Sequence, residues 1–250
     1  MVSSDLTPRY LRLPSRALGR SVHMWQYGHH GPPVIAFPTS GGYAHEWQQN
    51  GMVDALSDLI RAGRLKVYQP ETNVSRTWTG DGPVDERLSL HAAYERFVVD
   101  ELVPHIEADC GTPGIEVGLV GASVGALYAV NLALKHPKRF RRALGLSGRY
   151  ATRAFIGEYQ GLDAYYSTPL DYVWNLHGEE LERIRANTHL TLVVGRGAFE
   201  GRCIGETAAL ARAFRAVGVP HHHDEWGRDV AHTWSWWHRQ ARYHLPRLVA

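Results

Sequence analysis

Short runs of apolar residues recur along the chain and alternate with longer stretches of helical periodicity. Each run has few polar interruptions, as expected of strands that are buried on both faces of a parallel sheet. The runs occupy residues 34–37, 65–68, 117–120, 143–146 and 190–194. Residues 86–109 and 206–217 instead space their apolar side chains as an amphipathic helix does, and Gly218 is positioned to end the second helix.

This alternation of strands and helices predicts βαβ units with right-handed crossovers. The expected architecture is a three-layer α/β fold, in which helices cover both faces of a mostly parallel central sheet. Residues 9–13 and 21–27 are expected to pair as an antiparallel hairpin at the sheet edge. No repeat or linker divides the chain, and residues 1–250 are therefore expected to form a single domain.

One apolar stretch, between Glu116 and Lys135, lacks charge over a length that would suffice for a membrane helix. Several glycines crowd its first half, however, and glycine is unfavourable inside a helix. A buried strand at residues 115–120, a tight turn and a helix at residues 124–135 account for these glycines, and Pro137 would end the helix. The sequence therefore predicts a strand–turn–helix unit rather than a membrane span.

The turn inside this unit reads Gly121-Ala122-Ser123-Val124-Gly125, which is the G-x-S-x-G pattern of the nucleophile elbow in α/β-hydrolases. Such a turn presents the serine hydroxyl above the sheet and requires small neighbouring residues. The Val124 amide would lie at a helix N-terminus, where N–H groups stabilise developing negative charge. Ser123 is therefore the predicted nucleophile, and the Val124 amide is a predicted oxyanion donor.

A serine nucleophile requires a base and an acid that orients the base, and in this fold the acid precedes the histidine along the chain. Glu200 follows the last apolar run and is the predicted acid, whereas Glu206 is a rival expected at the start of the next helix. His232 is the predicted base, because it lies between the expected last strand and a helix at residues 235–248. The tryptophans within residues 234–237 are expected to pack around its loop.

The second oxyanion donor is expected from the loop after the strand at residues 34–37, which reads Pro38-Thr39-Ser40-Gly41-Gly42. Ser40 is the preferred donor, and Gly41 is the close alternative. A plain glycine-rich turn would contain the same residues.

The sequences at 121–125 (GASVG) and 232–237 (HTWSWW), together with Glu200, resemble the putative-esterase family of α/β-hydrolases, which includes esterase D and the mycolyltransferases. Residues 99–106 (VDELVPHI) also resemble the family, and the resemblance extends over residues 20–245. It implies a final histidine followed closely by aromatic residues and, in some members, glutamate as the acid. The chain departs from the family in the loop at residues 38–42, where relatives often place a glycine after a polar residue.

Composition narrows the classes of function further. The net charge is +2 with histidine neutral, which disfavours an electrostatic nucleic-acid binder. The N-terminal residues lack the apolar segment of a signal peptide. Cys110 and Cys203 are too few for a disulfide framework, and a reducing, cytoplasmic location is therefore expected.

The fifteen histidines raise the question of a metal site. Residues 221–223 are consecutive histidines, but no HExxH motif occurs and no helical ligand pair accompanies the triplet. Neither a metal nor another cofactor is therefore predicted. His238 and His244, inside the C-terminal helix, are expected at its surface.

A long connection at residues 148–188 is rich in aromatic side chains. Connections of this length in compact domains are often functional, and aromatic residues suit the wall of an ester or acyl pocket. Packing of this excursion onto the domain is an equal alternative. The predicted substrate-binding residues, in the excursion and at the rim of the site, are Arg76, Trp78, Tyr150, Phe155 and Tyr159.

Together these features predict a serine esterase that needs no cofactor. Ser123 would attack the ester carbonyl, His232 would accept its proton, and water would release the acid from an acyl-enzyme. Acyl transfer to another acceptor would use the same residues, and a non-catalytic binding protein on the same fold is a second alternative. The expected partner is a small-molecule ester or acyl compound, with neither nucleic acid nor membrane, and no pattern indicates the oligomeric state.

Overall fold

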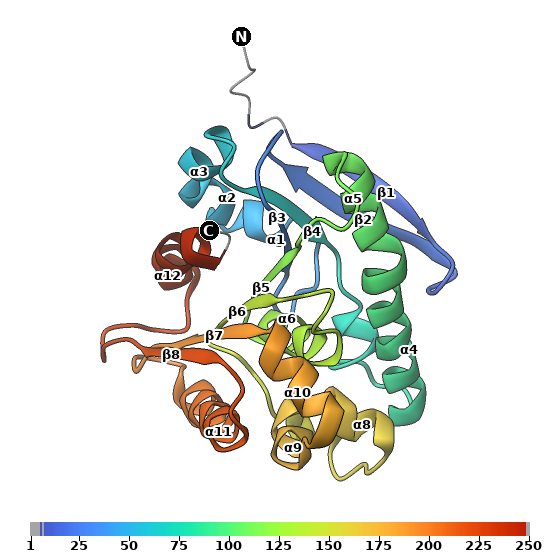
Figure 1. Ribbon diagram of the computed structural model, residues 1–250, viewed down its shortest axis with the longest axis vertical. Coiled ribbons are helices and arrows are strands. Elements are labelled where there is room, and N and C mark those ends of the chain that lie inside the picture. The colour runs from blue at the N-terminus through green and yellow to red at the C-terminus, as the bar shows by residue number, and fades with distance from the viewer. Residues whose placement is uncertain (1–5, 7, 249–250) are drawn as a thin grey trace.

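The computed structural model describes residue 6 and residues 8–248, and an eight-stranded sheet lies at its centre (Figure 1). The strand order across the sheet is β1-β2-β4-β3-β5-β6-β7-β8. β2 is antiparallel to both of its neighbours, and the pairings from β4 to β8 are parallel. The strands are β1 (Arg9–Ser15), β2 (Arg20–Tyr27), β3 (Pro33–Phe37), β4 (Lys66–Pro70), β5 (Gly118–Ala122), β6 (Arg142–Leu146), β7 (His189–Val194) and β8 (His221–Glu225).

Helices connect the strands and surround the sheet. Three short helices follow β3, and the excursion between β6 and β7 folds into four helices. The α-helices are α1 (Glu46–Gln49), α2 (Met52–Ala55), α3 (Ser57–Arg61), α4 (Val84–Phe97), α5 (Val103–Cys110), α6 (Val124–Lys135), α7 (Arg153–Ile156), α8 (Leu162–Ser167), α9 (Pro169–Tyr172), α10 (Gly178–Asn187), α11 (Gly201–Val217) and α12 (Trp234–Leu248). Single turns of other helix types lie at Val74–Arg76, Val98–Leu102 and Val173–Asn175.

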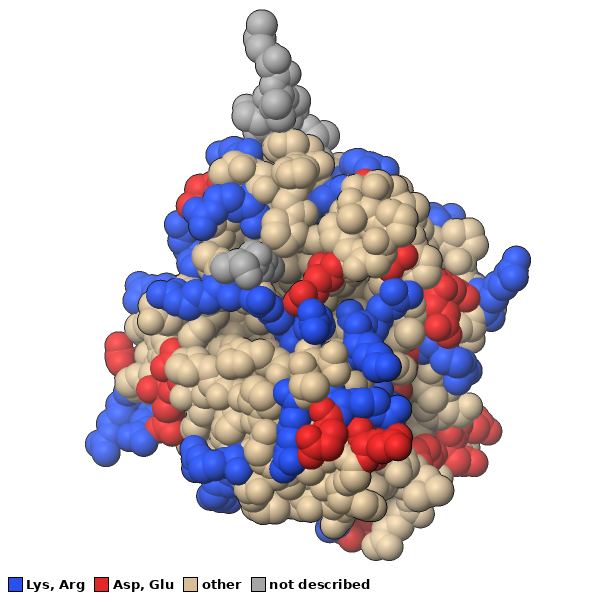
Figure 2. Space-filling model, viewed as in Figure 1, with Lys and Arg blue, Asp and Glu red and all other residues tan. Residues whose placement is uncertain are grey.

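Two hydrophobic cores form because successive residues of each strand point to opposite faces of the sheet. In β3, Ile35 and Phe37 enter the core beneath α4, α5, α6 and α11, whereas Val34 and Ala36 enter the core beneath α1–α3 and α12. This double burial explains the nearly continuous apolar runs. The predicted three-layer α/β fold and its edge hairpin are confirmed, and Figure 2 shows basic and acidic side chains interspersed over one face.

Three expectations about helices need correction. The predicted helix at 86–109 is two helices, α4 and α5, joined by a π turn just before Pro104, which has no N–H to continue an α-helical ladder. Glu206 does not begin its helix, because α11 starts at Gly201. His244 is 4% exposed and therefore buried rather than at the surface. Its Nε2 atom lies 2.9 Å from a carboxylate oxygen of Asp224.

His238, also expected at the surface, is partly buried. Its Nε2 atom lies 2.8 Å from the carbonyl oxygen of Asn50, which joins α12 to the turn between α1 and α2. Helical periodicity cannot reveal such a contact, because the partner lies far away in the sequence.

The apolar stretch at 116–135 forms β5 and α6, with Ser123 between them. Within residue 6 and residues 8–248, no helix is long and apolar enough to cross a membrane. The turn is extremely crowded. A Cβ atom on Gly121 would lie 2.2 Å from the carbonyl carbon of Gly125, and one on Gly125 would lie 2.5 Å from the carbonyl oxygen of Pro38.

This crowding yields a test within one strand. In Gly121→Ala, the added methyl group meets backbone atoms that cannot rotate away, and we expect a loss of about 3 kcal/mol in the free energy of unfolding. Gly118→Ala is the matched control, because its methyl group would make ordinary contacts of 3.4 and 3.5 Å with Val34 and Leu248, and its effect should stay below about 1 kcal/mol. Urea denaturation of both variants decides the matter, and equal stabilities would contradict the packing described.

Candidate active site

Ser123 has a left-handed backbone conformation that is rare for residues with a side chain, with φ 54° and ψ −118°. Its N–H donates to the carbonyl of Leu146 at 2.9 Å, which ties the turn to the end of β6. Its carbonyl accepts the N–H of Arg149 at 3.2 Å, and the chain after β6 therefore lies against the turn. A strained serine between a strand and a helix is what the G-x-S-x-G pattern predicts, and the role of Ser123 as a nucleophile stays a prediction.

The loop after β3 lies beside the first turn of α6, because Gly125 approaches the carbonyl of Pro38 without an intervening side chain. Val124 is the first residue of α6, and the first amides of a helix have no acceptor within the helix. The predicted donors Ser40 and Gly41 are both exposed in the adjoining loop.

Glu46 shapes this loop from α1. Its carboxylate accepts both the N–H of Thr39, at 2.6 Å, and the Thr39 hydroxyl, at 2.5 Å. Burial raises the pKa of Glu46, and these hydrogen bonds oppose the increase. Pro38 has no N–H and the Thr39 N–H is occupied, which leaves the amides of Ser40 and Gly41 as the candidates in this part of the loop.

Glu200 is the last residue before α11 and its side chain is fully buried. One carboxylate oxygen, Oε2, lies 3.3 Å from Nδ1 of His232. The other, Oε1, accepts the Ser147 hydroxyl at 2.5 Å, and Ser147 accepts Nε1–H of Trp237 at 3.0 Å. A buried carboxylate is tolerated when its oxygens are hydrogen-bonded, and both oxygens of Glu200 have such partners.

His232 lies in the loop between β8 and α12, with 20% of its side chain exposed. The backbone N–H of His232 donates to the carbonyl of Ala198 at 2.9 Å, and the backbone N–H of Gly197 donates to the carbonyl of Val230 at 2.8 Å. These two bonds join the loops that follow β7 and β8. The ring of Trp237 packs edge-on against the imidazole, with centroids 4.8 Å apart. The structure thus brings the predicted base and acid together.

The rival acid Glu206 has other partners. Its carboxylate accepts Nε–H of Arg149 at 3.2 Å and the N–H of Ala151 at 2.9 Å. It anchors the start of the excursion onto α11, whereas Glu200 contacts the imidazole. The geometry therefore favours Glu200.

Sequence reasoning missed two neighbours of this group, Ser147 and Cys203. Ser147 follows β6 directly, and the strand-end position is the signal that could have identified it. Cys203 lies one helical turn after Glu200, is 3% exposed, and places Sγ 3.7 Å from Nδ1 of His232. Burial, reinforced by the nearby Glu200 carboxylate, raises the pKa of the Cys203 thiol to about 12.

Two of the predicted substrate-binding residues lie in the core instead. Trp78 is 1% exposed and packs against His91 and Phe155, with centroids 4.7 and 6.1 Å apart. Tyr150 is fully buried, and its phenol fills the space left by the glycines at 145 and 148. The bulk of both side chains serves packing, which for Tyr150 is the alternative expected of the excursion.

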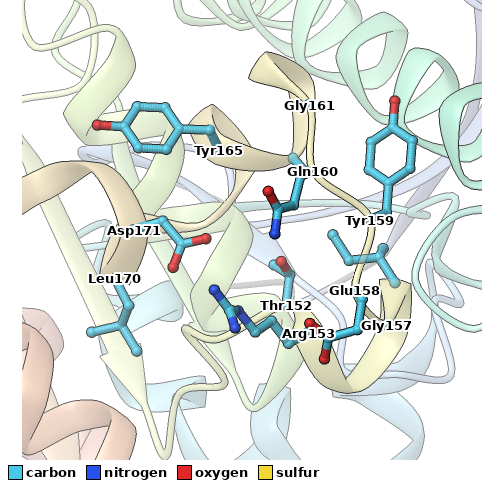
Figure 3. Close-up of a pocket in the computed structure, with 12 residues that line it drawn as sticks. Thr152, Arg153, Gly157, Glu158, Tyr159, Gln160, Gly161, Tyr165, Leu170 and Asp171 are labelled. Atoms are coloured by element: carbon cyan, nitrogen blue, oxygen red, sulfur yellow. The ribbon is translucent and has the colours of Figure 1, made fainter.

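The other three predicted substrate-binding residues keep some exposure. Arg76 is exposed at the end of its turn, and Phe155 is half-buried. Tyr159 lines a cavity of about 470 Å³ within the excursion, together with polar residues such as Arg153 and Asp171 (Figure 3). A role for these three residues in substrate binding stays a prediction.

Comparisons with solved structures find the same fold in several other proteins. Similar solved structures include a ferulic acid esterase (18% identity, 97% of each chain covered, TM-score 0.76). MPT51 (FbpC1) of Mycobacterium tuberculosis is similar too (17%, 97% of this chain and 99% of that one, TM-score 0.71), as is the S-formylglutathione hydrolase FrmB of Staphylococcus aureus (13%, 100% of each, TM-score 0.71). At these identities the likeness shows the fold alone.

Among curated proteins, none matches the chain. The family model described as putative esterase, however, matches residues 15–248, which is nearly the whole sequence. The chain therefore belongs to the putative-esterase family of α/β-hydrolases.

Proposed function

We propose that the protein is a serine esterase in which Ser123 is the nucleophile, His232 the general base and Glu200 the acid that orients it. The observation that carries this proposal is the contact between the buried Glu200 and the partly exposed His232, at the same edge of the sheet as the strained turn at Ser123. All three residues follow the carboxyl ends of parallel strands, which is where sites of open α/β sheets form.

In the first half of the reaction, Ser123 Oγ attacks the ester carbonyl carbon while Nε2 of His232 accepts the hydroxyl proton. The amides of Val124 and Ser40, or Gly41 in its place, donate hydrogen bonds to the resulting oxyanion. The intermediate then collapses, and the alcohol departs with the proton from Nε2. In the second half, water attacks the acyl-enzyme by the same route, and the acid is released.

Glu200 acts through the imidazole. Its Oε2 accepts a hydrogen bond from Nδ1–H, which leaves Nε2 unprotonated and able to accept the proton of the nucleophile, and its charge stabilises the imidazolium formed during attack. Ser147 and Trp237 hold the carboxylate and the ring in place, because their hydrogen bonds and the edge-on contact fix both partners.

Acyl transfer is the nearest alternative, because an alcohol or amine could replace water in the second half. Mass spectrometry of the acyl-enzyme with added acceptors separates the two reactions. A non-catalytic binding role is less well supported, since it would leave the strained backbone and the buried charge network without a purpose. One similar structure is named a fluorophosphonate-binding serine hydrolase of Staphylococcus aureus, and this suggests a suitable probe.

The nucleophile can be tested directly with a fluorophosphonate and with short p-nitrophenyl esters. We expect the wild type to be labelled once and to hydrolyse the esters. In Ser123→Ala, labelling should disappear and kcat should fall by about 10⁴-fold or more, because the attacking oxygen is gone. Labelling that persists in the variant, or is absent from the wild type, would contradict the proposal.

The acid assignment has its own matched pair of variants. Glu200→Gln keeps the side-chain volume but removes the charge and the preferred tautomer of His232, and kcat should fall by about 10²- to 10⁴-fold. Glu206→Gln changes an equally sized carboxylate that binds Arg149, and its kcat should stay within about threefold of the wild type. Initial rates with p-nitrophenyl acetate provide the measurement, and a larger loss in Glu206→Gln would reverse the assignment.

A further inference from the structure

Cys203 brings a third ligand type to the pair formed by Glu200 and His232. Within the described part of the chain, residue 6 and residues 8–248, these three residues are the one group of His, Cys, Asp or Glu whose ligand atoms are close enough to hold a metal ion together. The atoms concerned all lie within 4.8 Å of one another. The proposed esterase mechanism uses Glu200 and His232 but assigns no role to the thiol.

The spacing of the three atoms fits a tetrahedral cation with nitrogen and sulfur ligands. Zn–S and Zn–N bonds of about 2.3 and 2.0 Å place the two ligand atoms about 3.6 Å apart, and an oxygen ligand lies about 3.4 Å from the nitrogen. Cys203 Sγ lies 3.7 Å from Nδ1 of His232, and Glu200 Oε2 lies 3.3 Å from the same nitrogen. These two separations therefore need little adjustment, and the Sγ atom lies within 4.8 Å of the carboxylate ligand.

We propose that Cys203, His232 and Glu200 form an inhibitory site for a thiophilic divalent cation such as Zn²⁺. Three protein ligands leave one tetrahedral position for water. A thiolate and an imidazole select soft and borderline cations, whereas Mg²⁺ and Ca²⁺ prefer oxygen ligands. The inhibitory consequence rests on the proposed function, but the binding of the cation does not.

Inhibition follows from the proton balance. The cation binds Cys203 as a thiolate, and the thiol proton passes to solvent. It binds His232 through the lone pair of Nδ1, and the imidazole therefore carries its remaining proton on Nε2. Nε2 is then a donor and cannot accept the Ser123 proton. The cation also lies between Glu200 and Nδ1. The carboxylate can then neither hold a proton on Nδ1 nor stabilise the imidazolium formed during attack.

The group is reached most directly through the exposed residues beside it. Ala198 and Phe199 immediately precede Glu200 and are exposed, with 87% of Phe199 accessible, and His232 itself is partly exposed. Glu200 and Cys203 are buried beneath. A cation would therefore meet the imidazole first, and its binding should be slower than diffusion.

The test combines activity with a direct signal of thiolate binding. Zn²⁺ is titrated into p-nitrophenyl acetate hydrolysis by the wild type, Cys203→Ala, Cys203→Ser and Cys110→Ala, each compared with its own rate in EDTA. We expect inhibition of the wild type that EDTA reverses, and half-inhibition at concentrations more than about tenfold higher in both Cys203 variants. Cys110→Ala is the control, because its half-exposed thiol lies on α5 and contacts Tyr68.

Cd²⁺ titration provides the readout that needs no catalysis. The wild type and Cys110→Ala should develop ultraviolet thiolate-to-Cd²⁺ charge-transfer absorption with one equivalent of cation, and the Cys203 variants should not. Equal inhibition of the wild type and the folded Cys203 variants, or the absence of Cys203-dependent absorption, would overturn the proposal. A wild type without esterase activity would defeat the proposed function instead, and the Cd²⁺ absorption would still decide the metal site.

Discussion

The site depends on how closely backbone segments approach one another around Ser123. Glycine at 121 lets the end of β5 pass the first turn of α6, and glycine at 125 lets that turn touch the loop after β3. A single Cβ atom at either position would push these segments apart. The same contacts therefore bring the first turn of α6 and residues 38–42, which hold the proposed amide donors, close to each other beside Ser123. The proposed nucleophile and the proposed oxyanion donors therefore depend on one packing constraint.

A second close approach of backbone segments positions the proposed base, His232, and the proposed acid, Glu200. Gly195 and Gly197 lie against the backbone of Val230, where a Cβ atom would come within 2.1 and 2.7 Å of it. The loops after β7 and β8 can therefore exchange backbone hydrogen bonds, and Glu200 meets His232 across them. Trp237 extends this arrangement into α12, because its indole reaches Ser147 after β6. Three strands and the last helix thus support a single imidazole.

Local patterns predicted much of this arrangement. The limits of α6 agree with the expected helix at 124–135, because Ser123, Pro137 and the apolar periodicity all act within a few residues. The positions of Glu200 and His232 after strands predict that they lie close together, and their side chains are in contact in the structure. The burial of Trp78, Tyr150 and His244 was not predicted, because each depends on how neighbouring elements pack in three dimensions, which periodicity does not show.

The position of Cys203 beside His232 likewise could not be predicted from local sequence patterns. Its spacing from Glu200 is visible in the sequence, but only the fold places it beside His232. Histidine clusters in the sequence drew attention to residues 221–223, yet the group able to hold a cation combines residues from the start of α11 and a separate loop. Metal-ligand patterns are readable when the ligands share one element, and they are hidden when the ligands converge from several.

The central claim is that Ser123, His232 and Glu200 form one proton-transfer line beside two amide donors. A crystal structure of the fluorophosphonate adduct tests it most directly. The account predicts phosphorus bonded to Ser123 Oγ, with the phosphonyl oxygen about 3 Å from the amides of Val124 and Ser40 or Gly41, and Nε2 of His232 within hydrogen-bond reach of the adduct. An adduct on another residue, or an imidazole turned away from Ser123 with its contact to Glu200 broken, would contradict the account.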